Sequence, residues 1–301
     1  MSTAALRLGT RRSALALAQA RSVASALRDT MDRETVLVEI TTEGDVTSAP
    51  LAQIGGTGVF VNALRDALLA GRIDIAVHSL KDLPTAPAPG LTVAAVPPRE
   101  DPRDVLCARD GLTLSELPVG ARVGTGSPRR IAQLAALGLG LSVLPVRGNV
   151  DTRLSRVADG SLDAVVLARA GLARLGRLAE VTEVLDPLQV LPAPGQGALA
   201  VECRSDDAAV VGAVGVLDDP TTRDAVIAER SLLAALEAGC TAPVGAYAEA
   251  AEGDHCLELY LRAVAVSPDG SRSIRKSATG PLPAAERLGR DLAAEMLQDG
   301  A

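Results

Sequence analysis

Short apolar strands alternate with amphipathic helices along most of this 301-residue chain, and no other feature restricts its fold as strongly. In the first third, strands are predicted over Ala4–Leu8, Val36–Ile40, Ile73–Val77 and Leu91–Val96. Helices are expected after Ser13, a suitable N-cap, and over Val59–Leu69. Because strands that alternate with helices build βαβ units, the pattern predicts a largely parallel sheet with helices on its faces.

The same pattern restarts after a crossing rich in proline and charge at residues 97–102. Further strands are predicted to end near Val123 and to cover Leu141–Val146 and Leu162–Leu167. Ser127 is a suitable N-cap for one helix, and Pro128 suits the first position of that helix. Residues 147–149 are expected to open the next helix. A second α/β unit is therefore expected, although no close sequence repeat is visible.

The last third of the chain differs in kind. A second turn-rich crossing at 192–197 leads to a strand at Ala198–Glu202, and a helix then runs from Asp224 to Glu237, with Gly239 as its expected C-cap. The remaining strands and the closing helix are predicted at Val244–Ala250, Cys256–Val266, Ser271–Thr279 and Pro283–Leu297. An α+β tail with an antiparallel meander is expected.

Composition excludes several classes of function. Hydrophobic residues make up 48% of the chain and charged residues 22%, as in ordinary globular proteins. A net charge of -7 and an aromatic content of 1% disfavour binding to nucleic acid. No apolar run reaches membrane-spanning length, and the four cysteines lack the spacing of metal ligands, so no membrane and no metal site are expected. The chain is predicted to be cytoplasmic, with reduced thiols.

Positive charge is concentrated in two short segments of this acidic chain. Residues 123–130 and 146–153 hold four arginines among small polar residues: Arg129, Arg130, Arg147 and Arg153. Two guanidiniums about 6 Å apart repel each other by about 2–3 kcal/mol at an effective dielectric constant of about 20. A converging cluster therefore favours an anionic partner, and guanidinium matches carboxylate and phosphate. Helix N-termini also attract anions. The turn at Arg11 opens a helix as well, so it is a further candidate for an anion-binding site.

Two other segments carry reactive side chains, and the residues alone leave their roles open. Lys81 and Asp82 follow an apolar strand, where α/β sheets place chemistry, but they could equally form a surface ion pair. Cys240 lies on a Gly-Cys-Thr turn, where a thiol is either exposed and reactive or inert. The glycine patterns lack the P-loop and dinucleotide fingerprints, which disfavours ATP and NAD.

Taken together, the segments resemble the porphobilinogen deaminase family, also called hydroxymethylbilane synthases. The matching runs follow the family order over nearly the whole chain: 10–13, 44–45, 55–60, 74–82, 99–104, 123–130, 147–153, 170–176, 195–197 and 239–240. The resemblance implies a transferase that deaminates four porphobilinogens and joins them head to tail, releasing hydroxymethylbilane for porphyrin and heme biosynthesis. It also implies a dipyrromethane cofactor attached by a thioether to Cys240, with Asp82 as the catalytic carboxylate.

Further roles are implied by the same resemblance. Cofactor and substrate acids are expected to be held by Arg11, Ser13, Ser79, Lys81, Thr125, Ser127, Arg129, Arg130, Arg147, Arg153, Arg174 and Gln196. The family's lid segment matches Gly55, Gly56 and Phe60. Thr57 and Glu43 stand where the family often has basic residues, which weakens the case for a salt bridge between lid and substrate.

The implied fold has two doubly wound α/β domains, similar to type II periplasmic binding proteins, that face a cleft, and a smaller α+β domain. The expected domains are 1–97 with 198–216, then 98–197, then 217–301 with the cofactor cysteine. A monomer is expected. The main competing hypothesis is a non-catalytic, periplasmic-type carboxylate-binding protein, and a phosphate-substrate transferase is the third. The first of these does not account for Cys240, for the third domain or for the missing export signal.

Overall fold

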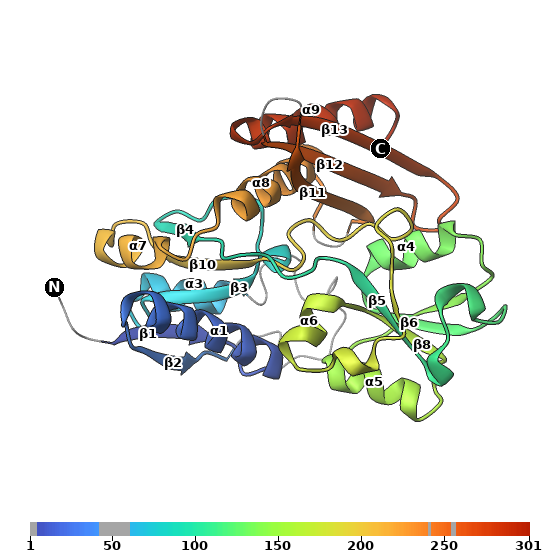
Figure 1. Ribbon diagram of the computed structural model, residues 1–301, viewed down its shortest axis with the longest axis horizontal. Coiled ribbons are helices and arrows are strands. Elements are labelled where there is room, and N and C mark those ends of the chain that lie inside the picture. The colour runs from blue at the N-terminus through green and yellow to red at the C-terminus, as the bar shows by residue number, and fades with distance from the viewer. Residues whose placement is uncertain (1–4, 42–60, 240–241, 254–256) are drawn as a thin grey trace. The chain divides into compact units, whose positions relative to one another are not determined.

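The computed structural model describes residues 5–41, 61–239, 242–253 and 257–301 (Figure 1). Its contacts divide the chain into two compact units. The first contains Met1–Arg99 and Ala198–Arg223, and the second contains Glu100–Gly197 and Asp224–Ala301. Within the described residues, no helix combines the length and apolar character that crossing a membrane requires.

The first unit is built on a sheet in the order β2-β1-β3-β10-β4. Its strands are β1 (Leu6–Thr10), β2 (Thr35–Glu39), β3 (Ile75–Ser79), β4 (Leu91–Ala95) and β10 (Leu199–Arg204). β1 pairs in parallel with β2 and β3, as predicted, whereas β10 runs antiparallel to both β3 and β4. The accompanying helices are α1 (Ala14–Met31), α3 (Asn62–Leu69) and α7 (Ala208–Gly215). Val23 and Leu27 of α1 are among the buried residues that pack with the strands.

The second unit contains a sheet with the same arrangement, β7-β6-β8-β5-β9. Its strands are β5 (Asp104–Ala108), β6 (Arg122–Thr125), β7 (Ser142–Pro145), β8 (Ala164–Ala168) and β9 (Glu183–Val184). β6 pairs in parallel with β7 and β8, and β5 is antiparallel to β8 and β9. The helices are α4 (Pro128–Ala136), α5 (Val150–Ala158) and α6 (Arg169–Arg174). The two sheets thus share one strand order and one set of strand directions, although no close sequence repeat marks it.

The same unit also contains an antiparallel sheet of β11 (Val244–Glu252), β12 (Leu257–Val266) and β13 (Ser273–Pro281). Helix α8 (Pro220–Ala235), from Asp224 on, and helix α9 (Ala285–Gln298) accompany this sheet (Figure 1). Leu232 of α8 and Leu292 of α9 are buried with Leu259 and Leu261 of β12 in one core. A side chain on Gly289 would overlap the carbonyl of Ala228, so this glycine permits the two helices to pack closely.

Short 3-10 turns complete the described secondary structure: η1 (Leu80–Asp82), η2 (Arg109–Gly111), η3 (Leu114–Glu116), η4 (Leu178–Glu180) and η5 (Leu282–Ala284). The predicted fold class is confirmed, since two doubly wound α/β sheets are followed by a smaller α+β part. The three domain boundaries stay a prediction.

One local prediction is wrong. α8 begins at Pro220 and ends at Ala235, rather than continuing to Glu237 with Gly239 as its cap. The chain instead leaves the helix at Glu237, whose φ of 52° lies in the left-handed region. Asp219 supplies the unpredicted start, since its carboxylate accepts a hydrogen bond from the backbone N–H of Thr222 at 2.6 Å.

Candidate functional site

The carboxyl ends of β1 and β3 bring the predicted residues of the first unit to one edge of its sheet. These strands are parallel neighbours, so the segments that follow them lie on the same side. Arg11 and Ser13 follow β1, and Ser13 caps α1 by accepting a hydrogen bond from the N–H of Ala16 at 3.3 Å. Lys81 and Asp82 lie on η1, directly after β3, with Lys81 half-buried and Asp82 exposed.

Ser79 is oriented by a residue that the sequence does not single out. Gln19 of α1 is buried, with 5% of its surface exposed, and its Nε2 donates a hydrogen bond to Ser79 Oγ at 2.8 Å. A buried amide must find a partner, because leaving it unpaired carries a desolvation penalty of about 1–3 kcal/mol. The contact therefore positions the hydroxyl at the end of β3.

A buried network of charged side chains involves β3, the strand that ends at Ser79. His78 Nε2 is 3.2 Å from Glu202 Oε2, and Arg65 Nη2 donates to Glu202 Oε1 at 2.9 Å. Burial would raise the pKa of Glu202, but the hydrogen bonds from His78 and Arg65 outweigh it and lower that pKa. The network connects β10, β3 and α3, and it fixes the strand that leads into Ser79 and Lys81.

The second unit gathers the arginine-rich segments at the corresponding edge. β6 pairs in parallel with both β7 and β8, and it ends at Thr125. Ser127 follows β6, Arg147 and Arg153 follow β7, and Arg174 follows β8. The predicted helix starts are confirmed in position, with Ser127 before α4 and Asn149 before α5. Asn149 Oδ1 accepts the backbone N–H of Thr152 at 2.8 Å, whereas the Ser127 side chain makes no capping bond.

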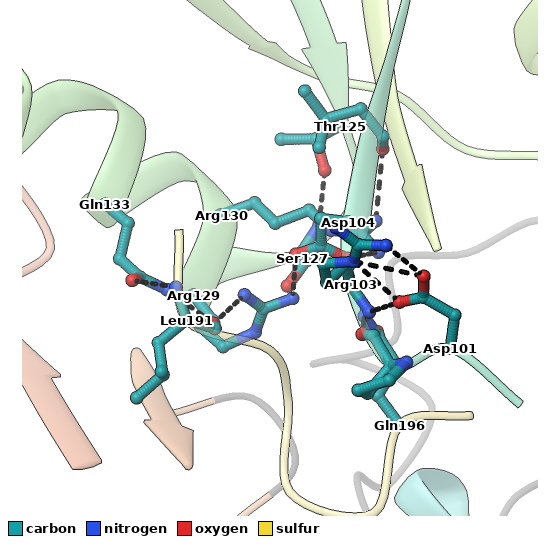
Figure 2. A network of polar contacts seen from close by, with 12 residues as sticks. Asp101, Arg103, Asp104, Thr125, Ser127, Arg129, Arg130, Gln133, Leu191 and Gln196 are labelled. Atoms are coloured by element: carbon teal, nitrogen blue, oxygen red, sulfur yellow. Dashed lines mark hydrogen bonds and ion pairs between the residues drawn. The ribbon is translucent and has the colours of Figure 1, made fainter. Parts of the chain in front are cut away.

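Arg129 and Arg130 share an internal anion, which corrects the expectation that their mutual repulsion is relieved only by an external ligand. Asp104, the first residue of β5, is fully buried. Its Oδ2 accepts a hydrogen bond from Arg129 Nη2, and its Oδ1 accepts one from Arg130 Nη2, both at 2.7 Å (Figure 2). Burial would raise the pKa of Asp104, but the two guanidiniums hold it well below its usual range.

Arg153 has no such partner. It is half-buried, its Nε donates to the carbonyl of Gly148 at 2.9 Å, and no ion pair to it occurs in the described part of the chain. Burial lowers the pKa of Arg153, and the neighbouring charges of Arg130 and Arg147 lower it further. This edge of the sheet therefore keeps an excess of positive charge, which favours an anionic ligand.

Gln196 and Arg174 both donate hydrogen bonds to backbone carbonyls of the second unit. Gln196 is buried, and its Nε2 donates to Asp104 Oδ1 at 2.7 Å and to the carbonyl of Pro102 at 2.6 Å. Arg174 Nη2 donates to the carbonyl of Gly197 at 2.7 Å, and burial lowers the pKa of Arg174. Both side chains therefore hold the crossing segment at 195–197 against neighbouring backbone.

Some predicted residues lie outside the described residues. These are the cofactor cysteine Cys240, the lid residues Gly55, Gly56 and Phe60, and the departures Glu43 and Thr57. Cys107 and Cys203 are both buried in strands, and burial raises their thiol pKa values to about 12 and about 11. No group of metal-ligating side chains occurs among the residues that the structure places.

Comparison with known proteins identifies related sequences over the whole chain. The family model "Porphobilinogen deaminase, dipyromethane cofactor binding domain" matches residues 6–212, and "Porphobilinogen deaminase, C-terminal domain" matches 224–298. "Porphobilinogen deaminase 1" of Streptomyces coelicolor is 61% identical, covering 100% of this chain and 97% of that protein. The Nocardia farcinica and Mycobacterium tuberculosis relatives, both named "Porphobilinogen deaminase", are 60% and 58% identical, covering 98% of this chain and 86% and 97% of their own lengths.

Among solved structures, a periplasmic substrate-binding protein of an ABC transporter from Coxiella burnetii covers 72% of this chain and 94% of its own. Its sequence identity is 11% and its TM-score is 0.46, so it adds nothing to the topology described above.

Proposed function

This chain belongs to the porphobilinogen deaminase family of tetrapyrrole synthesis, and we propose that it joins four porphobilinogens head to tail and releases hydroxymethylbilane. The first matched family model is the dipyrromethane cofactor-binding domain, so dipyrromethane is the cofactor of this enzyme. Each pyrrole ring of this cofactor and of the substrate carries an acetate and a propionate. The ligand is therefore a chain of carboxylates.

The observation that carries this proposal is the excess of positive charge beside β6 and β7. Arg153 lies near Arg130 and Arg147 without a carboxylate partner in the described residues, and their charges lower its pKa. A guanidinium of this kind fits the carboxylates of the cofactor, because charge-assisted hydrogen bonds contribute about 1.5–3 kcal/mol each.

We assign the binding of cofactor and substrate acids to the predicted polar residues at the two sheet edges. They are Arg11, Ser13, Ser79, Lys81, Thr125, Ser127, Arg129, Arg130, Arg147, Arg153, Arg174 and Gln196. Cys240 is assigned as the point of attachment. When bound, the cofactor supplies the free pyrrole position to which substrate units are added.

Asp82 is assigned the catalytic role. Its carboxylate is exposed at the end of η1, so a ligand can reach it, and Lys81 beside it offers an ammonium for a substrate carboxylate. As ammonia leaves porphobilinogen, positive charge develops on the substrate carbon and its ring. A fixed carboxylate close to that charge lowers the barrier electrostatically.

The experiment that tests the proposal is intact-mass analysis of the purified protein. Wild type is expected to carry an added mass equal to two porphobilinogens less two ammonia molecules, located by peptide mapping on Cys240. Cys240→Ser should lose both the added mass and activity, while the matched control Cys256→Ser should keep both. A fully active wild type without added mass would contradict the proposal.

Three further proposals concern the location of the enzyme, its oligomeric state and its domain boundaries. We propose that the enzyme is a cytoplasmic monomer with domains at 1–97 plus 198–216, 98–197 and 217–301. Sedimentation velocity tests the monomer, and a species of twice the chain's 30.7 kDa mass would contradict it. Limited proteolysis tests the boundaries, since cleavage between domains should precede cleavage within them.

A further inference from the structure

We propose that Asp104 is a positioning residue of the anion-binding site, whose buried carboxylate fixes Arg129 and Arg130 in place before the ligand binds. The inference rests on the proposed function, because the ligand it concerns is the chain of pyrrole carboxylates. Asp104 itself is not a ligand contact. It is fully buried, and its negative charge would repel the carboxylates that the arginines attract.

The carboxylate of Asp104 is fully engaged by the protein. Oδ1 accepts hydrogen bonds from Arg130 Nη2 and Gln196 Nε2, each at 2.7 Å, and Oδ2 accepts one from Arg129 Nη2 at 2.7 Å (Figure 2). Gln196 is also bound to the carbonyl of Pro102, two residues before Asp104. The position of the carboxylate is thereby determined by its own strand end and by the crossing segment at 195–197.

Each guanidinium is held at a second point by a backbone carbonyl. Arg129 Nη1 donates to the carbonyl of Leu191, and Arg130 Nη1 donates to that of Val166 at 3.1 Å. The Leu191 backbone is fixed in turn by Gln133, whose Oε1 accepts its N–H at 2.8 Å and whose Nε2 donates to its carbonyl at 3.0 Å. Neither guanidinium plane can therefore rotate without breaking two hydrogen bonds.

This arrangement keeps positive charge available to a ligand. The two guanidiniums and one carboxylate carry a net charge of +1, and Arg129 and Arg130 lie in the first turn of α4, where the helix dipole adds positive potential. Side chains that are already ordered lose little conformational entropy on binding, so a preorganised pair binds an anion more tightly than a mobile one.

Two explanations of the role of Asp104 predict opposite changes in anion affinity when its charge is removed. If Asp104 only offsets charge, Asp104→Asn raises the net charge of the site and strengthens anion binding. If Asp104 positions the arginines, the same variant weakens anion binding, because the guanidiniums repel each other and lose their common anchor.

Asp163 provides the matched control. It also accepts hydrogen bonds from two arginines of the second unit, from Arg122 Nη2 at 3.1 Å and from Arg109 Nη2 at 3.3 Å. It directly precedes β8, so it lies at the opposite end of the strand from Asp104, which pairs with Ala168. Asp163→Asn therefore removes a similar ion-pair cluster away from the arginine-rich edge.

The test measures the binding of benzene-1,2,4,5-tetracarboxylate by calorimetry in a Cys240→Ser background, together with adduct formation in the Cys240 protein supplied with porphobilinogen. Asp104→Asn is expected to raise the Kd of the probe and to slow adduct formation by about tenfold or more, since small misplacements of binding groups have effects of this size. Asp163→Asn should leave both within about twofold of wild type while lowering the melting temperature. An unchanged or lower Kd for Asp104→Asn would overturn the proposal.

Two further outcomes remain informative. If the wild type forms no adduct, the proposed function fails, but the probe affinities still decide the role of Asp104. If Asp104→Asn does not fold, Asp104→Glu replaces it, because this change keeps the charge but adds one methylene and so displaces the carboxylate from the two guanidiniums. Asp104→Glu is then expected to raise the probe Kd by about threefold or more, and an unchanged Kd would overturn the proposal.

Discussion

The structure predicts a large loss of stability when a single methyl group is added at Gly197. Its φ is 88°, in the left-handed region, and a Cβ there would overlap the carbonyl oxygen of Glu100 and lie 3.3 Å from Pro102 Cα. The carbonyl of Gly197 also accepts hydrogen bonds from Arg174 Nη2 at 2.7 Å and from the Glu100 N–H at 3.3 Å. Gly197→Ala must therefore displace backbone on both sides of the crossing.

The magnitude follows from two contributions. The left-handed conformation costs an alanine about 1–2 kcal/mol, and overpacking against a backbone that cannot move freely adds about 1–3 kcal/mol. We expect Gly197→Ala to lower the free energy of unfolding by about 2–5 kcal/mol. Gly176 separates the contributions, because its φ of 68° is similar but no atom lies within 4 Å of its added Cβ. Gly176→Ala should lower the free energy by about 1–2 kcal/mol.

Urea unfolding followed by circular dichroism measures both variants against wild type. The difference between them isolates the steric contribution, provided that the dependence of the unfolding free energy on urea stays the same. Gly197→Ala should also raise KM, because its displaced carbonyl no longer holds Arg174. Equal losses of stability in the two variants would refute the close packing of Gly197 against Glu100.

Two other variants test the first unit. Asp82→Asn should keep the fold and the covalent adduct while turnover collapses. Asp66 is an exposed carboxylate on α3, and the control variant Asp66→Asn should leave turnover unchanged. Near-normal product formation by Asp82→Asn would remove Asp82 from catalysis. Glu202→Gln should be less stable than wild type at neutral pH. Because the folded pKa of Glu202 lies below its ordinary value of 4.5, its contribution is complete above 4.5 and is lost as the pH falls through the lower folded value. The stability difference between wild type and Glu202→Gln should therefore shrink below about pH 4.5, and a difference independent of pH would exclude a charged Glu202 in the network.

The strands that the sequence predicts match the structure to within about two residues, whereas β5 and β9 were not predicted. The errors at two strand ends have a physical cause. Gly9 and Gly124 suggest turns, so the predicted strands end before them, but both lie inside strands, in β1 and β6. A Cβ on Gly124 would lie 2.5 Å from Leu162 Cδ1, and one on Gly9 would overlap Ile73 Cδ1. These glycines allow neighbouring side chains to pack directly onto the strand backbone, which depends on residues far away in sequence.

The sheet edges could also be predicted, because a strand followed by small polar residues and a helix places its loop at the carboxyl end of a parallel sheet. This pattern predicts the placement of Arg11, Arg129 and Arg147, whereas the binding roles of Ser79 and Ser127 are implied only by the family resemblance. The supporting residues could not. Gln19 lies within a helix sixty positions before its partner Ser79, and no local pattern marks the contact.

Asp104 shows where reasoning from charge density along the chain is incomplete. The arginine-rich segments suggest an unbalanced cluster because the nearest acid that matters lies 25 residues before Arg129. A signal was nonetheless present, since Asp104 directly precedes the apolar residues Val105, Leu106 and Cys107. A carboxylate at the start of a buried strand requires a cationic partner. The positive charge that remains for a ligand is thus smaller than the count of arginines suggests, and it is centred on Arg153, so a substitution there should alter ligand affinity with less effect on stability than substitutions at Arg129 or Arg130.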